Sequence, residues 1–99
     1  MSMEGTGVRT VVIHFPVGLH VRPATIIAKK ARNFQAEVFL IHEDRKVSTR
    51  SPMDMFMLGA EKGTELKLEA SQADDAQRAL DEIAALFAEN CPEMHIPSE

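Results

Sequence analysis

The chain has 99 residues, of which 44% are hydrophobic and 26% are charged, and its formal net charge is −4. This length suits one small domain with one hydrophobic core. The ordinary apolar content argues against disorder, and an acidic chain without Trp or Tyr argues against a nucleic-acid-binding surface. We therefore expect a single globular domain that does not bind nucleic acid.

Cellular location is indicated by what the sequence lacks. No stretch approaches the roughly 18 apolar residues that span a membrane, and residues 1–5 lack the basic and apolar parts of a signal peptide. The single cysteine, Cys91, cannot form an internal disulfide and fits a reducing compartment. Together with His95 it supplies too few ligands for a structural zinc site. We expect a cytoplasmic protein with no membrane insertion and no metal site.

The pattern of apolar residues predicts four strands and three helices. Alternating or β-branched apolar runs predict strands at 8–15, 37–42, 46–49 and 64–70. Apolar residues at helical spacing predict helices at 24–34, 51–58 and 76–87. The first helix starts at Val21 or at Pro23, because a proline disfavours helical backbone in the residue before it. Asn90 and Pro92 end the last helix.

These elements, in the order strand, helix, strand, strand, helix, strand, helix, predict an α+β fold. Strands with one polar face and helices with one apolar stripe pack as two layers. We expect an open-faced two-layer sandwich, in which a four-stranded antiparallel sheet has three helices on one face. The domain covers residues 8–90, between a flexible N-terminus at 1–7 and a C-terminal tail at 91–99.

The segment Gly18–Ala24, with the sequence Gly-Leu-His-Val-Arg-Pro-Ala, is the most informative part of the chain. It places His20 at a helix start, where backbone N–H groups lack intrahelical partners and bear the positive end of the helix dipole. Such groups suit an anion. A phosphoryl group on an imidazole nitrogen is one, and Arg22 can add charge-assisted hydrogen bonds to it. We interpret His20 as a phosphoryl acceptor; the alternative is an incidental surface histidine.

A second segment, residues 50–59, has the signals of a helix start. Ser51 suits the N-cap, Pro52 the first helical position and Asp54 the first turn, while Gly59 suits the position after the last turn.

The same short helix has more apolar residues than one face can bury. We expect Leu58 and Met55 in the core, and Met53 and Phe56 on the surface, where soft apolar side chains are typical of docking surfaces.

Both segments resemble the histidine-containing phosphocarrier protein (HPr) family of the bacterial phosphoenolpyruvate-dependent phosphotransferase system. Gly18–Ala24 resembles its active-site loop, and Arg50–Met53 with Leu58-Gly59 resembles its regulatory segment, which centres on a serine. The similarity covers residues 10–89. It implies a carrier that accepts a phosphoryl group from enzyme I on His20 and passes it to a sugar-specific A component.

The resemblance also implies the roles of single residues. The neutral imidazole of His20 would attack phosphorus through Nδ1, and Arg22 would neutralise phosphoryl charge. Gly18, Val21 and Pro23 would form the backbone of the phosphoryl site. The carrier would need no cofactor, and magnesium would serve only the enzyme I step.

Departures from the family pattern leave alternatives open. Val17 stands where many relatives have Asn or Ser. Ser51 is a candidate phosphosite for a Ser kinase, but Asp54 would repel a phosphate there, and the plain N-cap interpretation is favoured.

Two other functions stay open for the whole protein. One is a regulatory, nitrogen-type HPr-like protein that is phosphorylated at His20 and binds regulatory targets. The other is a non-catalytic interaction module in which His20 is incidental. Of the remaining histidines, we expect His14 to be a half-buried strand residue and His42 to be solvated at a hairpin edge.

Overall fold

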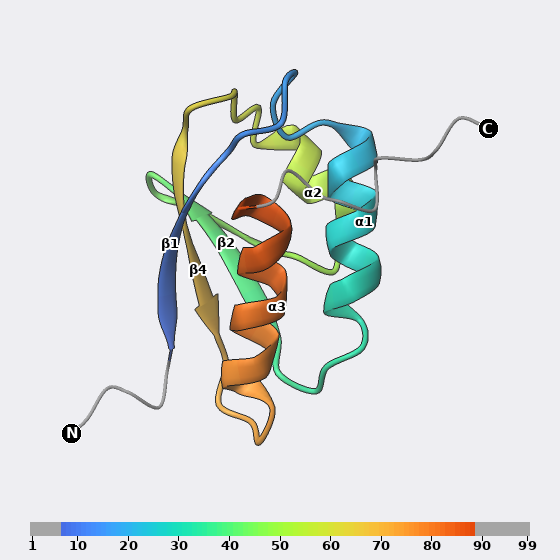
Figure 1. Cartoon of the computed structure of the whole chain (residues 1–99), viewed down its shortest axis with the longest axis vertical. Helices are drawn as coiled ribbons and strands as arrows, with labels where there is room; N and C mark the ends of the chain where they lie inside the picture. Colours follow the sequence, from blue (N-terminus) through green and yellow to red (C-terminus); the bar gives the residue numbers. More distant parts are fainter. Residues whose placement is uncertain (1–6, 89–99) are drawn as a thin grey trace.

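The structure is a computed structural model that describes residues 7–88 (Figure 1). The strands are β1 (Val8–Val12), β2 (Val38–His42), β3 (Arg45–Ser48) and β4 (Glu65–Ala70). The helices are α1 (Val21–Ala31), α2 (Pro52–Met57) and α3 (Ala76–Ala88). The predicted N-terminus before residue 7, the tail at 91–99 with Cys91 and His95, and the helix stop at Asn90 and Pro92 lie outside the described residues.

Within residues 7–88 the strands form one four-stranded antiparallel sheet in the order β1-β4-β2-β3. Figure 1 shows the helices in a second layer against one face of this sheet. Helix α3 packs on β1, β4 and β2, and α2 packs between α1 and β3. The predicted open-faced two-layer sandwich is confirmed.

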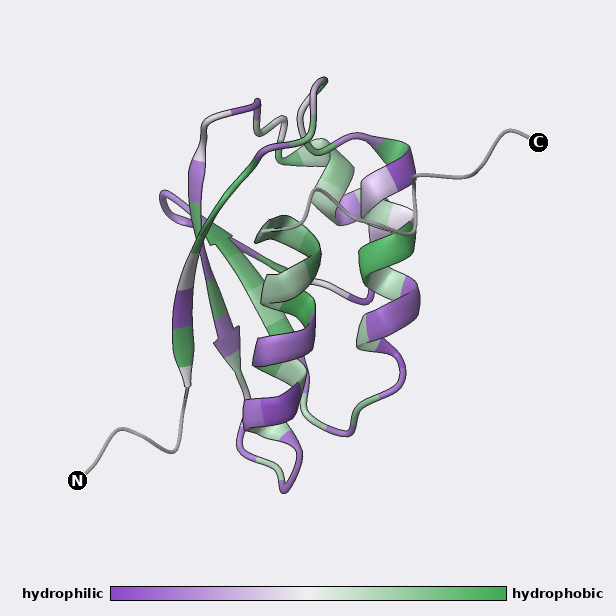
Figure 2. Cartoon of the chain, viewed as in Figure 1, coloured by the Kyte–Doolittle hydropathy of each residue, from purple (hydrophilic) through white to green (hydrophobic). Residues whose placement is uncertain are grey.

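The core lies between the two layers. On β4, Leu66, Leu68 and Ala70 are buried against the helices, while Glu65 and Lys67 face solvent on the open side. In Figure 2, β2 and the upper part of α3 are mainly hydrophobic, whereas the lower part of α3 has broad hydrophilic bands. The sheet therefore has one buried and one wet face, as the alternation of residues predicts.

Some element ends differ from the predictions. Regular pairing of β1 stops at Val12, although the Ile13 N–H still donates to the Thr64 carbonyl at 3.0 Å. Helix α1 ends at Ala31 and not at Phe34, because the chain tightens there: the Phe34 N–H donates to the carbonyl only three residues back, at Ala31. Phe34 is still buried, so its apolar spacing reflects the core and not the helix.

The hairpin between β2 and β3 is also one residue tighter than predicted. Glu43 has a positive φ of 59°, which completes the turn within Glu43 and Asp44, so β3 begins at Arg45. None of the helices within residues 7–88 is both long and apolar enough to cross a membrane.

Candidate functional site

The loop before α1 is held by backbone hydrogen bonds on both sides. The Gly18 N–H donates to the Phe15 carbonyl at 2.9 Å, which closes a turn with Pro16 at its second position. The Leu19 N–H donates to the Ala60 carbonyl at 2.9 Å, and the Leu19 side chain is buried. The loop that leads to the site is therefore fixed to the segment after α2.

Gly18 is required by this geometry. Its φ is +81°, in the left-handed region that favours glycine. A Cβ at this position would lie 2.7 Å from the Ala60 carbonyl oxygen and 3.1 Å from the Glu61 Cα, both of which are backbone atoms. The loop can approach the segment after α2 this closely only with glycine at residue 18.

The last turn of α3 packs against the residue that precedes the His20 loop. The rings of Phe15 and Phe87 are both fully buried, and their centroids are 5.7 Å apart. Phe15 immediately precedes the turn, so the packing of the core continues up to the site.

The start of α1 has unsatisfied backbone donors. His20 is the N-cap, with extended backbone, and its side chain makes no capping hydrogen bond. Its carbonyl accepts from the Ala24 N–H at 3.0 Å. The N–H groups of Val21 and Arg22 have no acceptor within residues 7–88, and Pro23 has no N–H. Two donors thus remain for an anion beside the imidazole.

The helix begins at the earlier of the two predicted positions, Val21. Pro23 lies in the first turn, where its missing N–H would have no intrahelical partner in any case.

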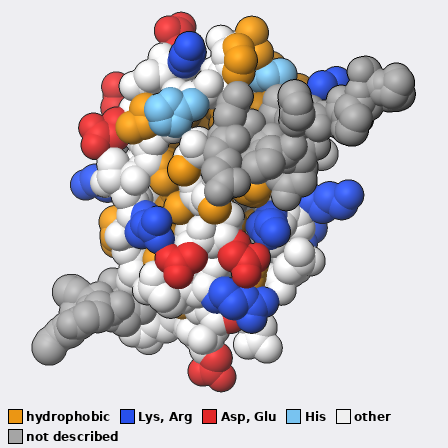
Figure 3. All heavy atoms as spheres, viewed as in Figure 1, with side chains coloured by type: hydrophobic (Ala, Val, Ile, Leu, Met, Phe, Trp, Pro, Cys, Tyr) orange, Lys and Arg blue, Asp and Glu red, His pale blue; other side chains and the backbone are white. Residues whose placement is uncertain are grey.

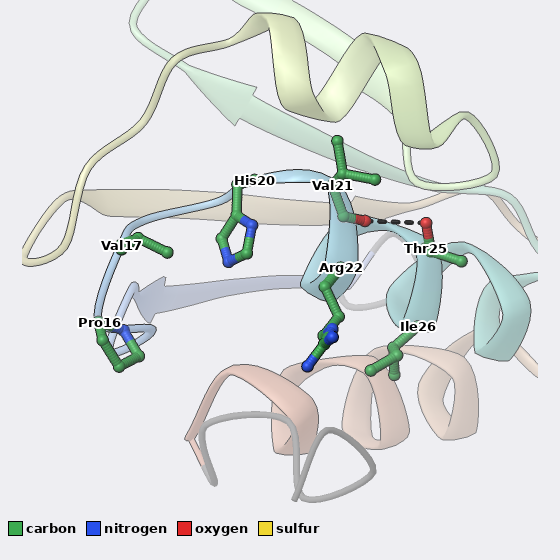
Figure 4. Close-up of a pocket in the computed structure, with 7 residues that line it drawn as sticks. All are labelled: Pro16, Val17, His20, Val21, Arg22, Thr25 and Ile26. Atoms are coloured by element: carbon green, nitrogen blue, oxygen red, sulfur yellow. Dashed lines mark hydrogen bonds between the residues drawn. The ribbon is translucent and has the colours of Figure 1, made fainter. Parts of the chain in front are cut away.

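A shallow open depression surrounds His20 (Figure 4). It is lined by Pro16, Val17, His20, Val21, Arg22, Thr25 and Ile26. Figure 4 shows the His20 ring and the Arg22 side chain projecting toward the same side of the helix start. Within residues 7–88 the Arg22 guanidinium makes no ion pair or hydrogen bond, so its positive charge is available at the depression.

The start of α2 is different, because its own side chain caps it. The Ser51 hydroxyl accepts from the Asp54 N–H at 3.3 Å, and Pro52 occupies the first position. After the helix, Gly59 has a φ of 68°. The N-cap interpretation of Ser51 and the predicted place of Gly59 after the last turn agree with this geometry.

Exposure along α2 follows the predicted division. Met55 and Leu58 are buried, whereas Met53 is 62% and Phe56 is 41% exposed. Met57, for which the sequence predicted neither burial nor exposure, is 61% exposed. We call Met53, Phe56 and Met57 the α2 surface. The excess of apolar residues in this short helix predicted that part of it would be an exposed apolar surface.

The α2 surface lies close to the His20 loop in the fold. Helices α1 and α2 pack against each other, and Val21 at the start of α1 is 55% exposed. Figures 1 and 4 both show α2 beside the start of α1. Exposed apolar side chains of two neighbouring helices therefore lie near the His20 loop, and Val21 lines the depression itself.

The other histidines do not line the depression. His14 is exposed, not half-buried as predicted, because β1 ends at Val12, before it. The His42 side chain is 24% exposed, so it is less solvated than predicted.

Comparisons with known proteins agree with one another. Residues 8–89 match the family model described as "PTS HPr component phosphorylation site". The HPr-like protein Crh of Bacillus subtilis is 37% identical over 79 residues, which cover 80% of this chain and 92% of Crh. A phosphocarrier protein HPr of Neisseria meningitidis is 38% identical over 69 residues, covering 68% of this chain and 78% of that protein.

The fold gives the same result. The crystal structure of HPr-C-His from Thermoanaerobacter tengcongensis superposes with a TM-score of 0.81 at 28% identity, covering 87% of this chain and 96% of that one. The fold and the matched segment place the chain among the phosphocarriers of the phosphotransferase system. Within that class, it belongs to the HPr family.

Proposed function

We propose that His20 accepts a phosphoryl group from phospho-enzyme I and passes it to a sugar-specific A component of the phosphotransferase system. The observation that supports this most directly is the uncapped start of α1, where the N–H groups of Val21 and Arg22 have no acceptor within residues 7–88. A phosphoryl group on the ring would accept these hydrogen bonds and act as the missing cap.

The proposed step is an in-line transfer. The lone pair of the neutral His20 imidazole attacks phosphorus, a nitrogen–phosphorus bond forms, and the bond between phosphorus and the donor breaks with its electron pair leaving on the donor. Arg22 and the two N–H groups stabilise charge on the phosphoryl oxygens. Transfer to the acceptor is the same step in reverse, with His20 as the leaving group.

The loop prepares this geometry before a partner arrives. Gly18 allows the close approach to Ala60, and buried Leu19 anchors the residue before the histidine. Fixed positions lower the entropy cost of bringing the ring into line with phosphorus. We propose no cofactor for the carrier itself, and magnesium would be needed only when enzyme I is charged.

Partners must cover the depression to reach the ring. We propose that enzyme I and the acceptors dock on Met53 and Phe56, together with Met57 and Val21; all four are exposed, and Val21 lines the depression. Phe56→Ala should raise the Michaelis constant for enzyme I without abolishing phosphorylation at saturating enzyme I. Amide chemical shifts that change on enzyme I binding only on the open face of the sheet would contradict this docking site.

The likeness to Crh favours a second candidate, in which the chain is an HPr-like regulator that binds targets when His20 is phosphorylated. In that case enzyme I would still charge His20, but no sugar-specific A component would discharge it. We propose that Ser51 serves as the N-cap, and incubation with a Ser kinase would test the competing phosphosite.

Phosphorylation in vitro tests the main proposal. With phosphoenolpyruvate, magnesium and a compatible enzyme I, the protein should gain one phosphoryl group that is labile in acid and stable in alkali. His20→Ala should abolish this label. His14→Ala is the matched control, because His14 is exposed outside the depression, and it should be labelled normally. Label retained in His20→Ala would leave the interaction module as the better interpretation.

A further inference from the structure

The sheet has two edges, and neither belongs to the depression around His20. In the order β1-β4-β2-β3, the outer strands β1 and β3 each have a neighbour on one side only. Figure 1 shows β1 at the margin of the molecule, with none of the described helices beyond it. The free side of β1 is therefore a row of backbone groups with which another strand can pair.

The register with β4 shows which backbone groups of β1 are free. The Gly7 carbonyl accepts a hydrogen bond from the last residue of β4, and the Ile13 N–H donates to the residue just before β4. Pairing between these two points is continuous. Because hydrogen-bonded pairs alternate along an antiparallel ladder, the odd-numbered residues of β1 bond to β4. The N–H and C=O groups that point away from the sheet are therefore those of Val8, Thr10 and Val12.

The same three residues direct their side chains to the open face. Val11 is buried and Arg9 reaches α3, so the residues that alternate with them face the other way. Val8 is 53% and Val12 is 37% exposed, and Thr10 is exposed between them. The free edge thus has an apolar side chain at each end.

The two edges differ in how well they are protected against pairing. On β3, Lys46 is exposed, and α2 packs against the strand. Edge strands are commonly protected by Lys, Pro or a bulge, and β1 has none of these between residues 8 and 12. Its one charged side chain, Arg9, is paired with Asp81 of α3. Figure 3 shows acidic and basic side chains next to one another over α3, which agrees with this pairing.

Helix α3 leaves space beside the edge. A surface hollow runs between β1 and α3, and the side chains that α3 contributes to it are those of Ala84 and Ala88. These are small, so they leave the helix side of the edge open to a further strand.

We propose that the free edge of β1 pairs antiparallel with β1 of a second copy of this chain, which joins two four-stranded sheets into one. The strand is complementary to itself. With Thr10 opposite the partner's Thr10, Val8 lies opposite the partner's Val12, and each opposed pair exchanges two backbone hydrogen bonds. Thr–Thr and β-branched pairs are favourable across strands, and no like charges oppose each other.

This association is weak and leaves the depression uncovered. One pair of five-residue strands buries less than the roughly 1,200 Å² of a stable complex, so we expect a dissociation constant on the order of 100 µM. Helices α1 and α2 lie away from β1 in Figure 1. Both copies therefore keep His20 accessible, and the association does not depend on the proposed function.

Amide exchange with water, measured by NMR on the full chain, tests the pairing. Between about 20 µM and about 1 mM protein, exchange at Val8, Thr10 and Val12 should slow roughly fourfold as the dimer forms. The Lys46 N–H also points away from the sheet, on the β3 edge, and should exchange at an unchanged rate. Sedimentation velocity over the same range should show the mass rising toward that of a dimer.

Variants of the central residue provide the matched comparison. Thr10→Pro removes an N–H that β4 does not use, so the fold should persist while the dimer is lost. Thr10→Lys keeps the N–H but places like charges opposite each other, and it should also abolish the dimer. Thr10→Val keeps the backbone groups without adding charge, and it should associate as the wild type does.

Three outcomes would overturn the proposal. One is a protein that stays monomeric at about 1 mM, since the expected association would then be absent. Another is protection of the β1 amides that does not change with concentration, because a segment of the same chain would then cover the edge. The third is a dimer that survives both Thr10→Pro and Thr10→Lys, since it would use another surface.

Discussion

Helices α1 and α2 begin in opposite ways. At the start of α2, the Ser51 hydroxyl accepts from the Asp54 N–H. At the start of α1, the N-cap is His20, whose side chain caps nothing, and the donors of Val21 and Arg22 have no acceptor within residues 7–88. At the start of α2 a side chain of the helix's own sequence accepts a backbone N–H, whereas the free N–H groups at the start of α1 need an acceptor from outside the described chain.

This difference separates a structural role from a functional one. A capped start contributes stability at all times, typically about 1 kcal/mol. An uncapped start is less stable in the free protein and gains most when an anion arrives. The same backbone physics thus explains the N-cap at Ser51 and supports the proposed phosphoryl site at His20.

The largest expected effect is on the stability of the loop that precedes the uncapped start of α1. Gly18→Ala should lower the free energy of unfolding by roughly 2–4 kcal/mol, because its Cβ would clash with the Ala60 carbonyl at a left-handed φ. Gly59→Ala is the matched control, with a similar φ of 68° and nothing within 4 Å of the new Cβ; it should cost only about 1 kcal/mol. Urea unfolding measures both, and equal losses would contradict the close approach.

Removing the positive charge of Arg22 at the uncapped start of α1 should slow phosphoryl transfer. Arg22→Ala should reduce the rate of phosphoryl acceptance by roughly tenfold to a hundredfold, which corresponds to about 1.5–3 kcal/mol for a lost charge-assisted hydrogen bond. Arg22→Lys should recover part of the rate, because the charge remains. Stopped-flow or quenched-flow transfer from phospho-enzyme I measures this. A folded Arg22→Ala with wild-type rates would show that Arg22 is only a solvated helix residue.

At the start of α2, which Ser51 caps, we expect a change in stability without a change in the transfer rate. Ser51→Ala should lower the free energy of unfolding by about 1 kcal/mol through loss of the cap, while phosphoryl acceptance at His20 keeps its wild-type rate. Ser51→Asp should keep most of the stability, because Asp is also a good N-cap. Thermal unfolding together with the transfer assay checks both parts. A slowed transfer in Ser51→Ala would mean that the two helix starts are not independent.

The smallest effect concerns the start of α3. The Asp75 carboxylate accepts from the Gln35 N–H at 2.8 Å and the Ala36 N–H at 2.9 Å, and these hydrogen bonds lower the pKa of Asp75 below its ordinary value. A lowered pKa contributes stability that is present above the unfolded-state pKa and is lost as pH falls through the folded-state pKa.

Asp75→Asn should therefore lower the melting temperature slightly at pH 7, and the difference from wild type should shrink as pH falls below about 4. Circular dichroism melts at pH 7 and pH 3 measure this. A constant difference between the two proteins would show that the carboxylate charge is not involved.

Periodicity predicted the fold well because each element obeys one local rule. The alternation in β4, the Ser51 start and Gly59 are all explained by residues within a few positions of one another. The predicted end of α1 was wrong. Phe34 keeps the helical apolar spacing, but it lies in the loop after α1 and packs into the core from there. Core packing, not helix geometry, determines that spacing.

The candidate site was predictable in part. His20 and Arg22 could be paired from their spacing at a helix start, and the structure brings both to one depression. The clash that requires Gly18 and the contact between Phe15 and Phe87 involve residues far apart in the chain. Such contacts leave no local signal in a single sequence, so only the folded chain reveals them.

The open shape of the depression around His20 determines how long a phosphoryl group would survive there. Val17 on its rim is 72% exposed, and nothing in residues 7–88 closes over the ring. Water would therefore reach the nitrogen–phosphorus bond of a phosphorylated His20 as easily as a partner would. The lifetime of the phosphorylated protein would then be limited by the intrinsic hydrolysis of that bond, and each partner would itself have to exclude water during the transfer.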